Sequence, residues 1–461
     1  MSLNNRMFDF ILFLILHLCV AYQECEEYYT KRDFKAAVIE YQPVPFNPQI
    51  TAHDYLMQNV AKLQEYIIQN PHLDILVFPE YGLTSTEVLH FNIDLYAQDI
   101  PETLNDDPCS GNSSFWSIIE HISCIVKTGK LYVIINLITR HFRDYDGCDK
   151  DVCYFNTALV FDRQGYIIAK YHKIHVYEAP ILDVPRVERS AVFHTDFGYT
   201  LGLMICFDIN YEVPAQDLID HHVDALVFQA AWTDELPFLT SLQYHFGWAL
   251  AQNVTLISAG YHDPNTGSMG SGIFQAGQVL NMTYDPNSGP KIVTAHVGTK
   301  SPETHQFSMS KNEFYLYEDL SSYERKILDP EKSFEYLEFG GLHCNFTYEV
   351  IVKEMSEMEF VIYDGWRTFA NGKFRAKIQV CGLVPKCLKC DLTNFAAPTF
   401  RTLQISGNFK PKSTVMPVGL DPDLLPITSF NYENNEDLTS MQILQKSTYS
   451  AALYARIYEI K

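Results

Sequence analysis

The sequence predicts an α/β fold followed by a β-rich C-terminal region, and three observations support this. Between about Ala36 and Val297, short apolar runs alternate with longer amphipathic stretches, a pattern typical of alternating strands and helices. Most of these apolar runs are continuous, which indicates strands buried on both faces of their sheet. After about Lys300 the segments are β-rich instead, so we expect a second domain there.

The first region contains five predicted buried strands and two predicted helices. The strands are expected over residues 74–78, 131–136, 157–161, 200–205 and 225–228. A helix is expected between Thr51 and Asn70, where Pro71 follows, because four apolar side chains fall on one face: Leu56, Val60, Leu63 and Ile67. A second helix is expected over residues 238–253.

The C-terminal region contains predicted strands over residues 346–352, 358–363 and 374–380. The pair Asn371-Gly372 is a hairpin turn signal between the last two of them. Prolines at positions 411, 417, 422 and 426 interrupt the segments that follow. We therefore expect one domain over residues 30–305 and a second, β-rich domain over residues 306–461.

The length and composition agree with this division and exclude several classes of protein. A chain of 461 residues exceeds what one hydrophobic core usually serves. With 34 basic and 56 acidic residues the net charge is 34 − 56 = −22, and no basic patch is present, so we expect no binding to nucleic acid or to anionic membrane surfaces. The hydrophobic content of 47% excludes a largely disordered chain.

The first residues have the pattern of a secretion signal. Arg6 precedes an apolar stretch from Phe8 to Val20, and small residues follow it, which predicts a signal peptide over residues 1–21 cleaved after Ala21. The stretch is too short to span a bilayer comfortably. The last thirty residues carry charges throughout instead of the hydrophobic tail of a GPI signal. We expect a secreted, extracellular protein without a stable membrane anchor.

The cysteines and glycosylation sequons fit an oxidising compartment. Ten of the eleven cysteines remain after signal cleavage, and most should pair. The nearest neighbours, Cys109 with Cys124 and Cys148 with Cys153, are the easiest to bridge, although the sequence leaves the connectivity open. If one cysteine is a free nucleophile, Cys25 is the candidate for a second unpaired or interchain thiol. Four sequons predict glycosylation at Asn112, Asn253, Asn281 and Asn345.

Three chemically different residues stand where predicted strands end. Glu80 follows the segment 74–79, Lys173 lies in the segment 167–175, and Cys206 directly follows the apolar run 201–205. Ligand sites of α/β folds lie beyond the carboxyl ends of their strands, so these positions suit chemistry. Taken singly, each residue has an ordinary explanation: a solvated loop carboxylate, a lysine that extends to solvent and a small buried thiol.

Together, the segments around these residues resemble the nitrilase superfamily of carbon–nitrogen hydrolases, whose members use a Glu, Lys, Cys triad. The matching segments are Val77–Leu83, Lys170–Tyr177 and Gly202–Ile209. Further segments are similar to the vanin and biotinidase branch: Asp183–Pro185, His222–Phe228, Ala231-Trp232 and Gly270–Phe274. The resemblance implies a nitrilase-type α-β-β-α sandwich and the extra C-terminal domain of this branch.

The resemblance also implies a role for each residue. Cys206 would attack a linear amide to form a thioester, Glu80 would act as general base and acid, and Lys173 would stabilise the oxyanion. The backbone N–H of Phe207 is a candidate second oxyanion donor. We also expect the Lys173 ammonium to favour the Cys206 thiolate. No metal or organic cofactor is required, and the expected partner is a small-molecule amide; the sequence predicts no oligomeric state.

The candidate pocket residues are Tyr177, Glu178 and Trp232, which neighbour the motif segments, and Phe238 is a further aromatic candidate nearby. Related enzymes often carry a further acidic residue after the lysine motif, and Glu178 lies one position from that place. The branch implies pantetheine or biocytin as the substrate. We expect pantetheine hydrolysis to pantothenate and cysteamine, with biocytin as the alternative.

Three other hypotheses remain open at this stage. The chain could be a catalytically silent secreted binding protein on the same fold. A Cys-His protease would pair Cys206 with His172, His175 or His245 and use Asp208 to orient the histidine, but the flanking sequence is not papain-like. Zinc could be held by Cys344, Cys381, Cys387 and Cys390, although disulfides explain the same cysteines better in a secreted chain. The glycine-rich segment 267–272 is expected to be a turn that lines the active site.

Overall fold

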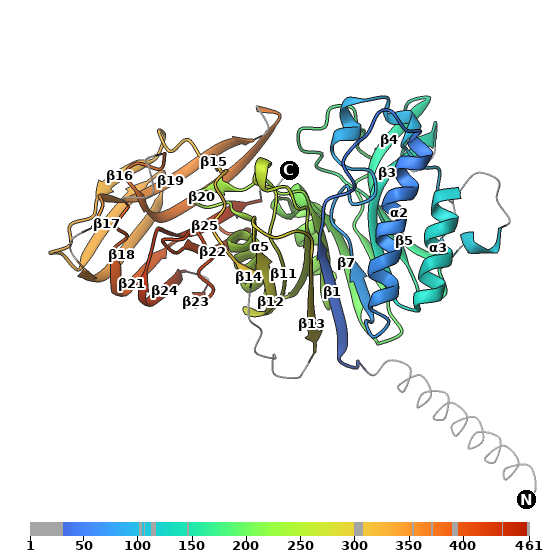
Figure 1. Cartoon of the computed structure of the whole chain (residues 1–461). Coiled ribbons are helices and arrows are strands. Elements are labelled where there is room, and N and C mark those ends of the chain that lie inside the picture. The colour runs from blue at the N-terminus through green and yellow to red at the C-terminus, as the bar shows by residue number, and fades with distance from the viewer. Residues whose placement is uncertain are drawn as a thin grey trace, which may run out of the picture.

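The protein has two parts that lie side by side, a layered α/β part and a β-sandwich (Figure 1). The computed structural model describes residues 31–100, 104–105, 107–111, 117–144, 147–298, 308–352, 355–369, 372–389, 395–435 and 437–458. The predicted signal peptide, Cys25, Cys390 and the sequon residue Asn112 lie outside the described residues. The domain bounds 30–305 and 306–461 stay predictions.

The first sheet has six strands in the order β13-β1-β2-β3-β4-β5. Their bounds are β1 Phe34–Glu40, β2 Ile75–Val77, β3 Tyr132–Phe142, β4 Val152–Phe161, β5 Ile167–His172 and β13 Lys291–Val297. Helices α2 (Ala52–Gln69) and α3 (Ser117–Gly129) cover its outer face (Figure 1).

The second sheet has seven strands in the order β14-β12-β11-β10-β8-β7-β6. Their bounds are β6 Ala191–His194, β7 Thr200–Ile205, β8 Ala225–Ala230, β10 Thr255–Gly260, β11 Ser271–Gln275, β12 Gln278–Tyr284 and β14 Ser308–Met309. Its apolar side chains join one core cluster with the inner face of the first sheet and with helix α5 (Ser241–Ala251); α4 (Asp217–Asp220) precedes β8. The predicted α-β-β-α sandwich is confirmed.

Burial on both faces of the sheets explains the continuous apolar runs. In β1, Ala36 and Val38 belong to the core between the two sheets, while Ala37 and Ile39 pack under the outer helices. Residues 36–40 of the strand are therefore all buried, whichever way their side chains point. The predicted strands over 200–205 and 225–228 coincide with β7 and with the start of β8.

Helix α2 forms as its sequence pattern predicts. The Thr51 hydroxyl accepts a hydrogen bond from the Asp54 backbone N–H at 3.0 Å and caps the helix N-terminus. All four apolar residues of the predicted face are buried: Leu56, Val60, Leu63 and Ile67. The helix ends at Asn70, because Pro71 cannot continue it. The second predicted helix is also present but begins later, at Ser241 rather than Phe238, because Thr240 adopts an extended conformation and forms the N-cap.

The C-terminal part consists of two stacked five-stranded sheets. One has the order β16-β19-β20-β25-β22, with bounds Glu324–Ile327, Met358–Phe369, Phe374–Pro385, Ser450–Ile457 and Ser413–Leu420. The other has the order β17-β18-β21-β24-β23, with bounds Phe334–Phe339, Leu342–Val352, Thr399–Gly407, Thr439–Ser447 and Asn431–Asn434. A separate two-stranded pairing joins β9 (Glu235–Leu236) to β15 (Leu316–Tyr317).

The predicted hairpin in this part is confirmed by its register. Strands β19 and β20 are antiparallel, and Phe369 is paired with Phe374 across the turn. Gly372 has a φ of +89°, a left-handed conformation that favours glycine. Ala370 and Asn371 lie outside the described residues. The hairpin extends from the sandwich toward the α/β part, where the Phe369 ring lies 5.4 Å from the Phe207 ring.

Helix α5 lies between the two parts and packs against β22 (Figure 1). An added Cβ on Gly247 would lie 2.4 Å from the backbone oxygen of Pro417, so this approach requires glycine. Phe238 is fully buried and faces Tyr454 of β25 at 6.2 Å. The two parts are therefore joined by a packed interface.

The cysteine pairing agrees with the disulfide prediction. Disulfides join Cys109 to Cys124, Cys148 to Cys153 and Cys344 to Cys381. Cys387 is disulfide-bonded as well. Because Cys344 and Cys381 are bonded to each other, they are not thiolate ligands, and the zinc hypothesis is wrong for this pair. Cys206 is a free, buried thiol.

Candidate active site

Three side chains from different strand ends meet between the two sheets. Glu80 follows β2 and Lys173 follows β5, both in the first sheet, while Cys206 follows β7 in the second sheet. The Lys173 Nζ lies 2.5 Å from the Glu80 Oε1. The Lys173 side chain is 2% exposed and that of Glu80 is 1% exposed, so this is a buried ion pair. A buried side chain keeps its charge only when it is paired with an opposite charge and hydrogen-bonded. Glu80 and Lys173 are each other's charged partner.

The Glu80 carboxylate is held by donors on both oxygens. The Asn156 side-chain amide donates to Oε1 at 2.8 Å, and the Ala231 backbone N–H donates to Oε2 at 2.8 Å. Asn156 in turn accepts a hydrogen bond from the Asn136 amide at 2.7 Å, and Asn136 accepts one from the Tyr81 backbone N–H at 2.7 Å. This chain of hydrogen bonds fixes the direction in which the carboxylate points.

Asn136 and Asn156 are positioning residues that the sequence analysis missed. Both are fully buried on the paired strands β3 and β4, where Asn136 lies opposite Ala158 and Asn156 lies opposite Ile138. The available signal was an asparagine that ends the apolar run Leu131–Asn136, because a buried amide inside such a strand needs a polar partner.

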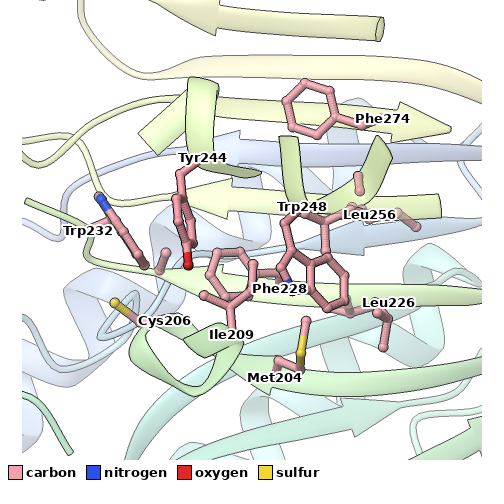
Figure 2. Close-up of a cluster of buried hydrophobic side chains, with 14 of the residues drawn as sticks. Met204, Cys206, Ile209, Leu226, Phe228, Trp232, Tyr244, Trp248, Leu256 and Phe274 are labelled. Atoms are coloured by element: carbon pink, nitrogen blue, oxygen red, sulfur yellow. The ribbon is translucent and has the colours of Figure 1, made fainter. Parts of the chain in front are cut away.

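Cys206 occupies a strained position at the start of the short helical turn η4 (Cys206–Asn210). Its φ is +51°, a left-handed conformation that is costly for any residue with a side chain. Figure 2 shows its sulfur at the edge of an apolar cluster that includes Met204, Ile209 and Trp232. Cys206 is 7% exposed and lies at the sharp junction between β7 and η4. Its exposed part borders two cavities.

The electrostatics of the three residues favour a protonated thiol. Burial and the adjacent Glu80 carboxylate raise the pKa of Cys206, and the opposing effect of Lys173 is smaller. Lys173 favours the thiolate, as expected, but burial and the Glu80 carboxylate outweigh its effect on the pKa of Cys206. Burial alone would lower the pKa of Lys173, but Glu80 and Cys206 raise it, so its ammonium is retained. Cys206 therefore needs a base, and the neighbouring Glu80 carboxylate is the acceptor available to it.

Asp208 ties the lysine segment to the cysteine turn. One carboxylate oxygen accepts hydrogen bonds from the His175 backbone N–H at 2.9 Å and lies 3.0 Å from the His175 Nδ1. The other accepts from the Tyr171 hydroxyl at 2.8 Å and from the Ile205 N–H at 3.2 Å. Asp208 is fully buried. Its hydrogen bonds join the residues that flank Lys173 to the residue that precedes Cys206.

This arrangement argues against the Cys-His protease hypothesis. The His175 ring stacks on Tyr211 at 3.6 Å. The His172 Nδ1 lies 2.8 Å from the Thr157 hydroxyl, and the His245 Nδ1 lies 3.2 Å from the Ser258 hydroxyl. Burial lowers the pKa of His245 to about 3, so it is neutral. Each of these histidines is thus engaged with a partner other than Cys206.

A wide cavity of about 460 Å³ opens onto the three residues. Its lining includes the predicted pocket residues Tyr177 and Glu178. Ser268, from the predicted glycine-rich turn, lines it as well, together with Asp263 and Thr266. The wall of the cavity therefore combines polar side chains with apolar ones such as Leu89, Pro180 and Ile181.

A narrow cavity of about 50 Å³ meets the wide one at Cys206. Trp232, the third predicted pocket residue, lines this narrow cavity, and Tyr177 lines both. Phe207 also borders it, next to the thiol. Phe369, from the C-terminal sandwich, completes the wall. Phe238 lies instead in the interface with Tyr454.

The remaining sequons differ in their surroundings. Asn253 is exposed directly after α5. Asn281 and Asn345 are half-buried within β12 and β18, and the Asn281 side-chain amide donates to the Thr294 backbone oxygen at 2.8 Å. Asn253 is the most accessible of the three, and glycosylation at all of them stays a prediction.

Comparison with known proteins identifies both parts of the chain. Residues 35–245 match the carbon-nitrogen hydrolase family, and residues 314–460 match the vanin C-terminal domain. The chain belongs to the vanin branch of the nitrilase superfamily. As a member of this branch, it is a hydrolase of carbon–nitrogen bonds other than peptide bonds.

Relatives of this vanin-branch protein align along most of its length. The pantetheinase of Homo sapiens is 25% identical, and the alignment covers 96% of this chain and 92% of that protein. The Vanin-like protein 2 of Drosophila melanogaster is 32% identical over 58% of this chain and 52% of that protein. The crystal structure of Nit3 from Saccharomyces cerevisiae, a nitrilase superfamily member, is 14% identical with a TM-score of 0.43, and covers 57% of this chain and 90% of that chain.

Proposed function

We propose that this protein is a pantetheinase-like amidohydrolase that converts pantetheine to pantothenate and cysteamine. One observation carries the proposal: a free, buried thiol lies against a buried Glu80–Lys173 ion pair at the junction of two cavities. The relatives that align along nearly the whole chain are named pantetheinases, which supports the choice of substrate.

The first half of the reaction forms a thioester. Glu80 takes the Cys206 thiol proton as the sulfur attacks the amide carbonyl carbon, and the carbonyl oxygen becomes an oxyanion. The Lys173 ammonium and the backbone N–H of Phe207 stabilise that oxyanion. The intermediate then collapses: the carbon–nitrogen bond breaks, and Glu80 returns the proton to the departing amine.

The second half releases the acid. Glu80 takes a proton from water, whose oxygen attacks the thioester carbonyl carbon. The carbon–sulfur bond breaks, the thiolate regains a proton from Glu80, and the carboxylic acid leaves. Because the ammonium of Lys173 is retained by the neighbouring carboxylate, the same oxyanion site serves both halves.

Secretion is part of this proposal. Three described disulfides and the exposed sequon residue Asn253 are what an oxidising, glycosylating compartment would produce. Within the described ranges, the helices are too short or too polar to cross a bilayer. Expression of the full chain in a eukaryotic cell should place the protein in the medium, where removal of N-linked glycans lowers its apparent mass. Retention inside the cell would contradict secretion.

The activity is tested by incubating the purified protein with pantetheine or with biocytin and separating the products by chromatography. We expect pantothenate and cysteamine from the first substrate and a slower release of lysine from the second. Cys206→Ala should abolish both reactions and leave the fold intact. If neither substrate is cleaved while a thiol reagent still labels Cys206, the substrate assignment is wrong; an unreactive Cys206 would favour a silent binding protein.

A further inference from the structure

The two cavities at Cys206 differ in size and chemistry, and an amide has two different halves. We propose that the narrow cavity binds the departing amine and that Phe369, from the C-terminal sandwich, limits the size of the amine the enzyme accepts. This inference rests on the proposed amidohydrolase activity. It assigns to the second part of the chain a direct role in selecting the substrate.

Aromatic and aliphatic side chains dominate the narrow cavity. Its walls include Tyr177, Phe207, Trp232, Leu239 and Phe369. The Phe369 ring lies 5.4 Å from the Phe207 ring, and Phe207 is the residue directly after the nucleophile. Phe369 is 7% exposed, so it forms a wall of the cavity and is covered on its other sides. Removing its ring would therefore enlarge a space that begins at Cys206.

The Phe369 wall is held in place by ion pairs that span the two parts of the chain. The Arg367 guanidinium lies over the Phe369 ring at 4.4 Å. The same guanidinium pairs with Glu235 at 2.6 Å and with Glu318 at 3.2 Å. Glu235 belongs to β9 and itself borders the narrow cavity. A wall fixed by such contacts can discriminate by size, because it does not yield to a larger ligand.

The nucleophile turn is fixed to the same sandwich. The Arg456 guanidinium donates two hydrogen bonds, at 3.0 and 2.7 Å, to the backbone oxygen of Asn210, the last residue of η4. The Asn210 side chain accepts a hydrogen bond from the Tyr244 hydroxyl at 2.7 Å. The distance between Cys206 and the Phe369 wall is thus set by contacts on both sides, and the cavity keeps its width.

Size and polarity together decide which half of the amide enters which cavity. A pantothenyl group is long and carries hydroxyls and an amide, which need partners such as the Glu178, Asp263 and Ser268 side chains of the wide cavity. In the mostly apolar narrow cavity those groups would lose hydrogen bonds to water with little replacement, because Asn210 is already bonded to Tyr244 and Glu235 to Arg367. A short amine such as cysteamine fits the narrow cavity. The lysine released from biocytin is longer, and its ammonium and carboxylate would lose water beside mostly apolar walls whose one carboxylate, Glu235, is already paired with Arg367.

The test uses a series of pantothenamides that share the pantothenyl group and carry amines of increasing bulk, from cysteamine through butylamine and hexylamine to benzylamine. For the unmodified protein, kcat/KM should fall at least about 10-fold from the smallest amine to the largest. Phe369→Ala should reduce that ratio to about 2-fold or less. Every substrate forms the same acyl-enzyme, so the rate of thioester hydrolysis, measured by rapid quench, should be the same across the series.

Phe374→Ala is the matched control. Phe374 comes from the same hairpin and its ring lies 5.2 Å from Phe207, but it is not among the side chains that line the narrow cavity. This variant should keep the selectivity of the unmodified protein. If it flattens the selectivity as much as Phe369→Ala does, loosening of Phe207 explains both and the inference is overturned. Phe369→Leu, which preserves more of the packing, should give an intermediate ratio and guards against misfolding of the alanine variant.

Failure of the proposed function would be recognised separately. If the unmodified protein cleaves none of the pantothenamides, the substrate assignment fails, and alkylation of Cys206 by iodoacetamides with N-substituents of increasing bulk then tests the wall itself. Phe369→Ala should accelerate alkylation by the bulky reagents more than by iodoacetamide. Equal acceleration, or none, would overturn the role of Phe369.

Discussion

The α/β part and the C-terminal sandwich place their buried charges differently. In the α/β part, Glu80, Lys173 and Asp208 are nearly or fully buried, and the core around them contains two buried asparagines. The core between the two sheets of the sandwich consists of hydrophobic side chains, with Phe346, Phe360 and Leu403 among the most buried. The sandwich buries charge at a different place, on the side that faces the α/β part, where Glu318 pairs with Arg367 and Arg456 donates to the Asn210 backbone oxygen.

The difference shows where this chain accepts the cost of burying charge. Taking an ion out of water is unfavourable unless a partner and hydrogen bonds replace the water, and the α/β part supplies both for Glu80. The sandwich acts on that site from outside, through Phe369 beside the nucleophile and Arg456 on its turn. Reactivity and support are therefore divided between the two parts.

The largest effect is expected from breaking the buried ion pair. In Lys173→Met the Glu80 carboxylate stays buried without a cation, so the free energy of unfolding should fall by about 3–5 kcal/mol. Amide hydrolysis should fall by about 10³-fold, because the oxyanion loses its charged partner. Denaturant unfolding and initial rates measure the two effects.

Lys62→Met provides the control for this change. Lys62 pairs with Glu65 at 3.4 Å on the exposed face of α2, and such a pair contributes less than about 1 kcal/mol. The double variant Lys173→Met/Glu80→Gln should recover part of the lost stability, since it no longer buries a lone charge. If Lys173→Met proves as stable as Lys62→Met, the loss of Lys173 does not lower the free energy of unfolding by about 3–5 kcal/mol, and the prediction is wrong.

A smaller effect, with a sign that can be worked out, is expected for the reactivity of Cys206 against pH. Burial and Glu80 raise the pKa of this thiol above its ordinary value of 9.0, so alkylation by iodoacetamide should accelerate only above about pH 9 in the unmodified protein. Glu80→Gln removes the carboxylate but keeps Lys173, which lowers the pKa. The alkylation profile of this variant should shift to lower pH, with about a 10-fold faster reaction near pH 7.5, while amide hydrolysis is lost. A shift to higher pH would contradict the electrostatic balance at this site.

The smallest effect on activity is expected within the sandwich. The disulfide between Cys344 and Cys381 closes a loop across a sequence separation of 37 residues, so replacing both cysteines with alanine should lower stability by about 3–4 kcal/mol. The initial rate at 20 °C should change less than about twofold, because neither residue touches the hairpin end that bears Phe369. Thermal unfolding and pantetheine hydrolysis on the same sample compare the two quantities. A loss of activity at full folding would show that the sandwich core itself tunes the site.

Much of the architecture was predictable because its signals are local. The continuous apolar runs predicted strands buried on both faces, and the spacing of Leu56, Val60 and Leu63 predicted helix α2. The positions of Glu80, Lys173 and Cys206 at strand ends, with their flanking motifs, indicated the candidate triad. Asn136, Asn156 and Asp208 carried weaker signals, since a buried polar residue shows its purpose only when its partner is known.

The sequence by itself determined the alternation of strands and helices in the first part, the two-part organisation, the membership in the vanin branch and the three residues proposed for catalysis. Only the tertiary structure decided that Cys206 rests as a thiol and that Phe369 borders its cavity. The first depends on whether Glu80 or Lys173 has the greater influence on the sulfur, which is a matter of distances between strands remote in the chain. The second depends on a hairpin of the sandwich reaching across the domain interface, and neither periodicity nor a motif encodes such a contact.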